Sequence, residues 1–127
     1  MPASIAAIVI LSSASRLRDS LRVLLKSTRP LIPIEAAEGL EAALPRLRGT
    51  APALVLIDAA LPGGAAWAAL EQIRQIYPQH RCVILAQTAA DQAQGRAAGV
   101  PVVGLDGLTA VGLLAAGRLA AESGDTV

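Results

Sequence analysis

Two kinds of hydrophobic pattern alternate along the chain. Five short aliphatic runs, at residues 5–11, 32–36, 54–58, 82–86 and 100–105, lack a strict alternation of polar and apolar positions. Parallel strands that are covered on both faces have this pattern, because their side chains meet packing neighbours on either side. The pattern therefore predicts five buried strands.

Helical spacing occupies the segments between these runs. Behind Ser15, a residue type that caps helices, four leucines repeat at intervals of one, three and four residues: Leu17, Leu21, Leu24 and Leu25. Four further helices are expected at residues 39–48, 67–77, 89–98 and 108–122. Pro78 and Gly99 follow two of these segments, and both residue types commonly end helices.

Five strands that alternate with five helices on short connections predict an α/β fold, the flavodoxin-like, doubly wound five-stranded parallel sheet of (βα)5 form. At 127 residues we expect one domain over residues 1–122. Residues 123–127 are expected to be a tail, or the start of a linker to an output domain. The functional crevice of such folds lies at the carboxyl ends of the strands. That rule selects Ser12, Ser13, Asp58, residues 86–88 and Asp106.

Composition narrows the class of protein. Hydrophobic residues make up 54% of the chain and the net charge is +1, which indicates a folded domain without direct contact to nucleic acid. The basic residues of the first helix are expected to form a solvated face: Arg16, Arg18, Arg22 and Lys26. The single Cys82 fits a small buried residue of a cytoplasmic protein. Residues 97–117 are nearly uncharged, but Pro101 and several glycines interrupt them, so no membrane segment is expected.

The segment LVLIDAALPGG places Asp58 at the end of an aliphatic run, before a Pro62–Gly63 turn. It resembles the phosphoacceptor segment of the receiver domains of bacterial response regulators. EAAEGLEAALPRLR, SRLRDSLRVLL and RAAGV resemble other parts of the same family, so the resemblance covers essentially the whole chain. The C-terminal LTAVGLLAAGRLAAESGDTV resembles the LuxR-type subfamily. The resemblance implies two-component signalling, a sensor histidine kinase as partner, and a helix-turn-helix DNA-binding output domain outside this chain.

Receiver domains of this family move a phosphoryl group onto the strand-three aspartate, with help from Mg²⁺ and a lysine. The resemblance puts their acidic pair on Ser12 and Ser13, their Ser/Thr switch on Gln87, and their lysine on Asp106. Thr88, next to Gln87, is the other candidate for the switch position. Asp58 and Asp106 then carry two negative charges with no cation expected beside them. No metal or cofactor is therefore expected, and Mg²⁺ enters only if Asp58 is phosphorylated.

Structural roles for the same residues stay open. Asp106 precedes Gly107 and is equally well explained as a turn residue in water. Ser12 and Ser13 are the types that end strands and cap helices. Asp58 could be a relic that hydrogen-bonds Ser12, Ser13 or Thr88. His80 is expected to be a surface loop residue.

The C-terminal helix suggests a contact surface. Arg118 and Glu122 are its only charges over residues 108–122, so we expect a second apolar face that packs on a partner. The expected interface, in a homodimer or against an output domain, is the following set: Leu108, Gly112, Leu113, Ala116, Gly117 and Ala120.

Three functions follow from these observations. The first, which we favour, is a degenerate, non-enzymatic receiver that works through dimerisation or partner binding. The second is an orthodox receiver phosphorylated on Asp58. The third is a small-ligand binding domain that uses the strand-end crevice, although no glycine-rich phosphate loop follows the first strand.

Overall fold

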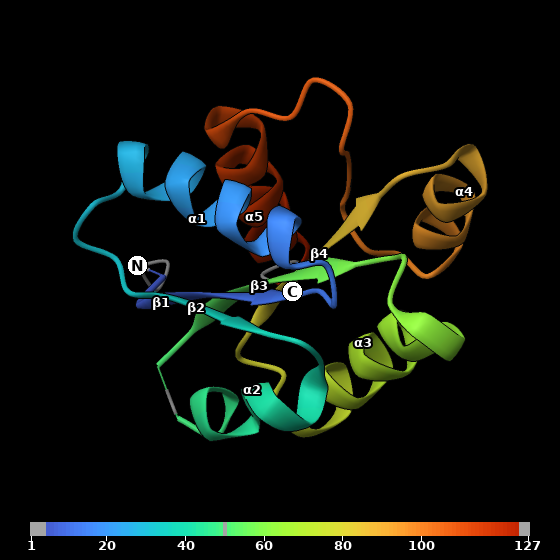
Figure 1. Cartoon of the computed structure of the whole chain (residues 1–127). Coiled ribbons are helices and arrows are strands. Elements are labelled where there is room, and N and C mark those ends of the chain that lie inside the picture. The colour runs from blue at the N-terminus through green and yellow to red at the C-terminus, as the bar shows by residue number, and fades with distance from the viewer. Residues whose placement is uncertain (1–4, 50, 125–127) are drawn as a thin grey trace.

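The computed structural model describes residues 5–49 and 51–124 of the chain, with side-chain packing described through residue 117. Its centre is a five-stranded parallel sheet in the order β2-β1-β3-β4-β5 (Figure 1). The strands are β1 (Ala7–Leu11), β2 (Ile34–Ala37), β3 (Ala53–Asp58), β4 (Arg81–Ala86) and β5 (Val102–Gly104). The predicted doubly wound, flavodoxin-like sheet is confirmed.

Five α-helices and one short 3-10 helix connect the strands. Their bounds are α1 (Ser15–Thr28), α2 (Leu40–Leu47), η1 (Pro62–Gly64), α3 (Ala65–Ile76), α4 (Ala89–Ala97) and α5 (Ala110–Gly124). In Figure 1, α1 and α5 lie on one face of the sheet, while α2 and α3 lie on the other. Each face of the sheet therefore has its own hydrophobic core.

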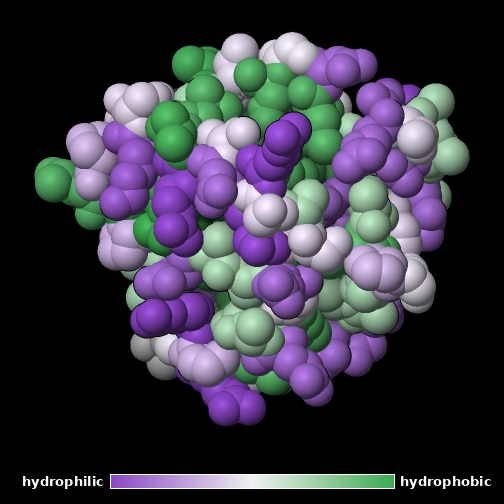
Figure 2. All heavy atoms as spheres, in the orientation of Figure 1, coloured by the Kyte–Doolittle hydropathy of each residue, from purple (hydrophilic) through white to green (hydrophobic). Residues whose placement is uncertain are grey.

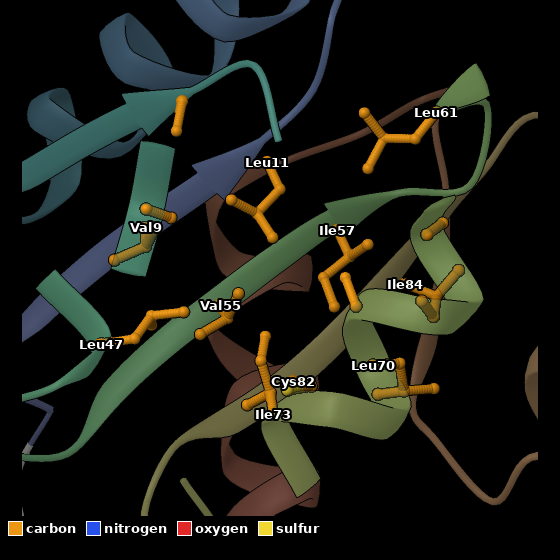
Figure 3. Packing of buried hydrophobic residues seen from close by; sticks show 14 of the residues in the cluster. Val9, Leu11, Leu47, Val55, Ile57, Leu61, Leu70, Ile73, Cys82 and Ile84 are labelled. Carbon is orange, nitrogen blue, oxygen red and sulfur yellow. The ribbon is translucent and has the colours of Figure 1, made fainter. Parts of the chain in front are cut away.

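Alternate residues of each central strand supply the two cores. On β1, Ile8 and Ile10 belong to the core under α1 and α5, while Val9 and Leu11 belong to the core under α2 and α3. Figure 3 shows the second core at close range, with strand side chains directed at the helices. Residues from four other elements meet there: Leu47, Val55, Ile57, Leu70, Ile73 and Ile84.

Three strands begin two residues later than the sequence pattern predicts, at Ala7, Ile34 and Val102. In two of these strands, a proline lies directly before the first strand residue: Pro33 before Ile34 and Pro101 before Val102. Proline has no N–H to donate to the hydrogen-bond ladder of a sheet. Pro33 and Pro101 still accept hydrogen bonds through their carbonyls, from the N–H groups of Ile8 and Ile84, both at 2.9 Å. The strands β2 and β5 therefore start at Ile34 and Val102.

Several helix ends also differ from expectation: α3 begins two residues earlier, at Ala65, and α5 two residues later, at Ala110. Ala14, not Ser15, is the N-cap of α1, and Ser15 is the first helical residue. At the other end of the chain, α5 continues through Gly124, two residues into the expected tail. Residues 125–127 of that tail lie outside the described residues. Among the residues that the structure describes, no helix is both long and apolar enough to cross a membrane.

His80 corrects a prediction, because it is buried and not a surface loop residue. Its side chain is 7% exposed. The N–H of Ala53, at the start of β3, donates to Nδ1 at 3.0 Å, and Nε2 donates to the carbonyl of Leu47 at 2.6 Å. The imidazole therefore ties the end of α2 and the start of β3 to the segment before β4.

Candidate functional site

The carboxyl ends of β1 and β3 bring Ser12 and Asp58 together. These strands are direct neighbours, with Leu11 opposite Ile57, so the next residue of each strand lies at the same edge of the sheet. Both side chains are buried, Ser12 at 0% and Asp58 at 1% exposure. The prediction that the strand-end crevice gathers these residues is met for this pair.

Both carboxylate oxygens of Asp58 are engaged. The Ser12 hydroxyl donates to Oδ2 at 2.7 Å, and the backbone N–H of Ala60 donates to Oδ1 at 2.9 Å. A buried carboxylate is tolerated only when such donors replace the water it has lost. Of the three partners considered for Asp58 from the sequence, the structure selects Ser12.

Arg18 is a residue that the sequence pattern did not select. Its guanidinium Nη1 donates to the backbone carbonyl of Ser12 at 2.6 Å, and the side chain is half-buried, so it is not simply part of a solvated face. A positive charge thus lies two hydrogen bonds from Asp58, through Ser12. The sequence did contain a signal for this contact. Arg18 lies in the first turn of the helix that follows β1, and a long basic side chain there can reach back to the end of the strand.

Ser13 does not join the site. It is exposed and forms no side-chain hydrogen bond within the described part of the chain, although it neighbours Ser12. The two serines therefore have different roles: one is a buried partner of Asp58 and the other faces water.

Gln87 and Thr88 are exposed and belong to the start of α4. Thr88 is the N-cap: its hydroxyl accepts from the N–H of Asp91 at 3.1 Å, and the Asp91 carboxylate accepts from the N–H groups of Gln87 and Thr88. This reciprocal pair is a capping box, which stabilises a helix N-terminus. Both residues therefore serve the helix, and neither side chain is hydrogen-bonded to Asp58.

Asp106 is exposed and lies in a turn with Gly107, whose φ of 68° is the left-handed conformation that glycine adopts readily. Of the two roles considered for Asp106, the turn residue in water is the one that this position supports. Solvent screens an exposed charge, so the repulsion expected between Asp58 and Asp106 is weak. The site's charge is therefore set mainly by Asp58 and Arg18.

Three of the expected interface residues pack inside the protein, which corrects that prediction. Leu113 and Ala116 are buried in the core beneath α5. Gly117 is buried too, and a Cβ on it would lie 3.1 Å from the Leu54 side chain, so its small size lets α5 approach its own sheet. Leu108 and Gly112 are half-buried, whereas Ala120 lies outside the described side chains.

Among the side chains of α5 that the structure describes, Val111 is the large apolar one that is exposed, at 70%, and the sequence interpretation did not include it. Figure 2 shows hydrophobic surface gathered at the top of the view, where Figure 1 places the start of α5 and the segment leading into it. The apolar face of α5 that reaches solvent is therefore centred elsewhere than on Leu113 and Ala116.

The oxygen atoms at this edge of the sheet are poor ligands for Mg²⁺. Magnesium prefers octahedral coordination by carboxylate, carbonyl and water oxygens. Asp58 supplies one carboxylate whose oxygens already accept hydrogen bonds, and Ser12 directs its proton at that carboxylate. Within residues 5–49 and 51–124, no cluster of three or more His, Cys, Asp or Glu residues has a geometry suited to a metal ion.

Solved structures of receiver domains are similar in fold to this chain. A receiver domain from Clostridium thermocellum superposes with a TM-score of 0.77 at 18% identity, covering 94% of this chain and 96% of that one. The signal receiver domain of an HD domain-containing protein from Pseudomonas fluorescens Pf-5 gives 0.73 at 22% identity, covering 98% and 100%. No protein-family model matches the chain, and no curated protein matches it in sequence.

A third similar structure is larger than this chain. NtrX from Brucella abortus matches with a TM-score of 0.75 at 20% identity, over 95% of this chain but 28% of the NtrX chain. The protein described here therefore has the fold of CheY-like response regulator receiver domains.

Proposed function

We propose that the chain is a receiver-like, non-enzymatic signalling module of a two-component or phosphorelay-type regulator, acting in the cytoplasm. In this proposal, phosphorylation of Asp58 is impaired, and dimerisation or partner binding carries the signal. The observation that supports it is the burial of Asp58 at 1% exposure with both carboxylate oxygens hydrogen-bonded.

The chemistry of the site argues against an efficient phosphoacceptor. A carboxylate that attacks a phosphoryl donor needs a free oxygen and a route to it, and here both oxygens are bonded and covered. The phosphoryl group then needs cations around its oxygens. Arg18 could supply one positive charge, but it is held on the carbonyl of Ser12. Ser12 and Ser13 offer neutral hydroxyls where Mg²⁺ would need anionic ligands.

Fluorescence of Trp67 tests this proposal. Trp67 is the single tryptophan, half-buried on α3, and it packs against the core beneath β3. Titration with Mg²⁺ and beryllofluoride, which imitates a phosphoryl group, is expected to give no saturable change. A triple variant with Ser12→Asp, Ser13→Asp and Asp106→Lys is the positive control. A saturable change in the wild type that disappears in Asp58→Ala would overturn the proposal.

A self-contact through α5 is part of the same proposal. Its exposed centre is Val111, with half-buried Leu108 and Gly112 beside it. Light scattering after size exclusion is expected to show a dimer that Val111→Glu dissociates, because a charge in an apolar contact loses its hydration. A wild type that stays monomeric at high concentration would remove dimerisation through α5 from the proposal.

The partners proposed from the resemblance are a sensor histidine kinase and a helix-turn-helix output domain of the LuxR type. The NtrX match supports an output role, because a receiver-like fold there accounts for 28% of a longer chain. A longer reading frame that encodes a helix-turn-helix after residue 127 would test this part.

A further inference from the structure

A groove opens between the N-terminal parts of α2 and α3, with a volume of about 520 Å³. Alanines and leucines make its floor and walls, among them Leu40, Leu61, Ala65 and Ala68. Glu38 and Glu41 are exposed on its α2 side, and no basic residue lines it. The groove is therefore apolar inside and negatively charged at its rim.

The surface over α2 and α3 is mixed in character. In the lower half of Figure 2, pale green apolar surface lies among purple side chains, in the region where Figure 1 places α2 and α3. An apolar groove with a charged rim suits an amphipathic segment that carries an apolar side chain between opposite charges.

The outer side of α1 has the complementary character. Val23 is 72% exposed there. Lys26 is exposed three residues later, on the same side of the helix, and Arg22 is exposed four residues before Lys26, at the edge of that side. With Arg16 and Asp19, the exposed charges of α1 sum to +2 against −2 on the groove rim.

We propose that α1 of a second copy of this chain docks in the α2–α3 groove, with Val23 inserted between Glu38 and Glu41 of the first copy. The contact is heterologous, because the two complementary surfaces lie on opposite faces of the sheet, so association is open-ended unless the rotation closes a ring. The inference rests on the partner-binding part of the proposed function and names both the partner and the surface.

The groove also reaches the site. Leu61, which lines it, donates its N–H to the carbonyl of Asp58 at 3.1 Å, and the N–H of Ala60 holds the Asp58 carboxylate. Leu61 therefore belongs both to the wall of the groove and to the short segment that holds Asp58.

A charge exchange tests the proposal. Sedimentation velocity would be recorded in the Val111→Glu background, so that a contact through α5 does not contribute. Without further changes, this Val111→Glu protein is expected to associate only at concentrations well above those of the light-scattering measurement, and the association should weaken at least about fivefold when salt is raised from about 0.05 to 0.5 M. A groove variant, Glu38→Lys with Glu41→Lys, and a helix variant, Arg22→Glu with Lys26→Glu, should each be monomeric alone.

Mixing the groove variant with the helix variant is the decisive test of docking. Each variant repels its own copies, but the acidic α1 of one matches the basic groove of the other, so the mixture should associate again. Glu71→Lys, on α3 outside the groove, makes half of the groove variant's change of charge and should leave association unchanged, and circular dichroism checks that every variant is folded.

Three results would overturn the proposal: a parent protein that stays monomeric at millimolar concentration, groove and helix variants that still associate alone, or a mixture that stays monomeric. None of these depends on whether Asp58 accepts a phosphoryl group. Failure of the docking proposal and failure of the impaired-phosphorylation proposal can therefore be told apart.

Discussion

At the scale of single residues, Ser12 uses every hydrogen-bonding group that it has. Its N–H donates to the carbonyl of Ala37, and its own carbonyl accepts from Arg18. Its hydroxyl donates to Asp58 and accepts from the N–H of Ala14. Ser12 thus joins β2, β3 and the start of α1. Its hydroxyl, although uncharged, supplies a donor to the buried carboxylate of Asp58.

Replacing Ser12 by alanine is expected to lower the free energy of unfolding by about 1–3 kcal/mol, because Oδ2 of Asp58 stays buried without its donor. Ser13→Ala is the matched control, since Ser13 is exposed and the expected change is below about 0.5 kcal/mol. Urea unfolding measures both. Equal effects of the two substitutions would contradict the role assigned to Ser12.

His80→Leu is expected to cost about 2–4 kcal/mol of unfolding free energy, because the N–H of Ala53 and the carbonyl of Leu47 lose their partner in a buried place. Gln79→Ala, in the same segment, removes an exposed hydrogen bond to Gly49 and should cost less than about 0.5 kcal/mol. Thermal and urea unfolding of both variants provide the comparison. A small effect of His80→Leu would mean that the imidazole is not a structural tie.

Burial raises the pKa of the Cys82 thiol from 9.0 to about 12, and the nearby Arg74 charge only partly opposes this. The folded state thus favours the neutral thiol. The contribution to stability is complete below pH 9 and is lost as the pH rises towards 12. At pH 10.5 the wild type should have lost about 2 kcal/mol relative to Cys82→Ala, compared with their difference at pH 8. Identical pH profiles of the two proteins would contradict the shift.

At the scale of elements, α4 is fixed to its neighbours from two sides. Arg74 of α3 donates to the carbonyls of Ala98 and Gly99, at 2.6 and 3.0 Å, where α4 ends. On the other side, Gly95 packs against β5 so closely that a Cβ on it would lie 2.2 Å from Val102. The helix therefore holds the edge strand in place through a residue without a side chain.

Gly95→Ala is expected to lower the unfolding free energy by about 1–3 kcal/mol, because α4 must move away from Val102 despite the better helix propensity of alanine. Gly49→Ala, just after α2, is the control: a Cβ there would lie 3.6 Å from the carbonyl oxygen of Arg46, an ordinary contact distance. Chemical denaturation distinguishes the two. A neutral Gly95→Ala would show that α4 is not tightly seated.

The pattern of hydrophobic positions was sufficient to predict the elements, because the three central strands are covered on both faces and the helices keep a regular apolar spacing. It failed at ends such as Ala14, which is the N-cap of α1 without any side-chain cap hydrogen bond. It also assigned Leu113 and Gly117 to an outer face of α5. Spacing alone cannot say which side of a nearly uncharged helix meets the sheet.

At the scale of the whole molecule, the parallel topology explains how much of the site was predictable. The rule that strand ends meet placed Ser12 beside Asp58 correctly. It could not reveal His80, whose ring bonds the backbone of Ala53 and Leu47, 27 and 33 residues earlier in the chain, because no local pattern encodes such contacts. Arg18 contacts a carbonyl only six residues away, so its place in the helix after β1 was the signal that could have revealed it. Thr88 and Asp106 lie after strands that end at the predicted edge. Thr88, however, caps α4, and Asp106 lies in an exposed turn.

The central claim is that the buried, hydrogen-bonded Asp58 accepts a phosphoryl group poorly. Intact-mass spectrometry after incubation with a small phosphodonor and Mg²⁺ tests it most directly, with a receiver domain of proven phosphorylation in parallel to show that the donor is active. We predict an unchanged mass for this protein while the parallel domain gains one phosphoryl group. A gain of one phosphoryl group in the wild type, absent in Asp58→Ala, would contradict the account.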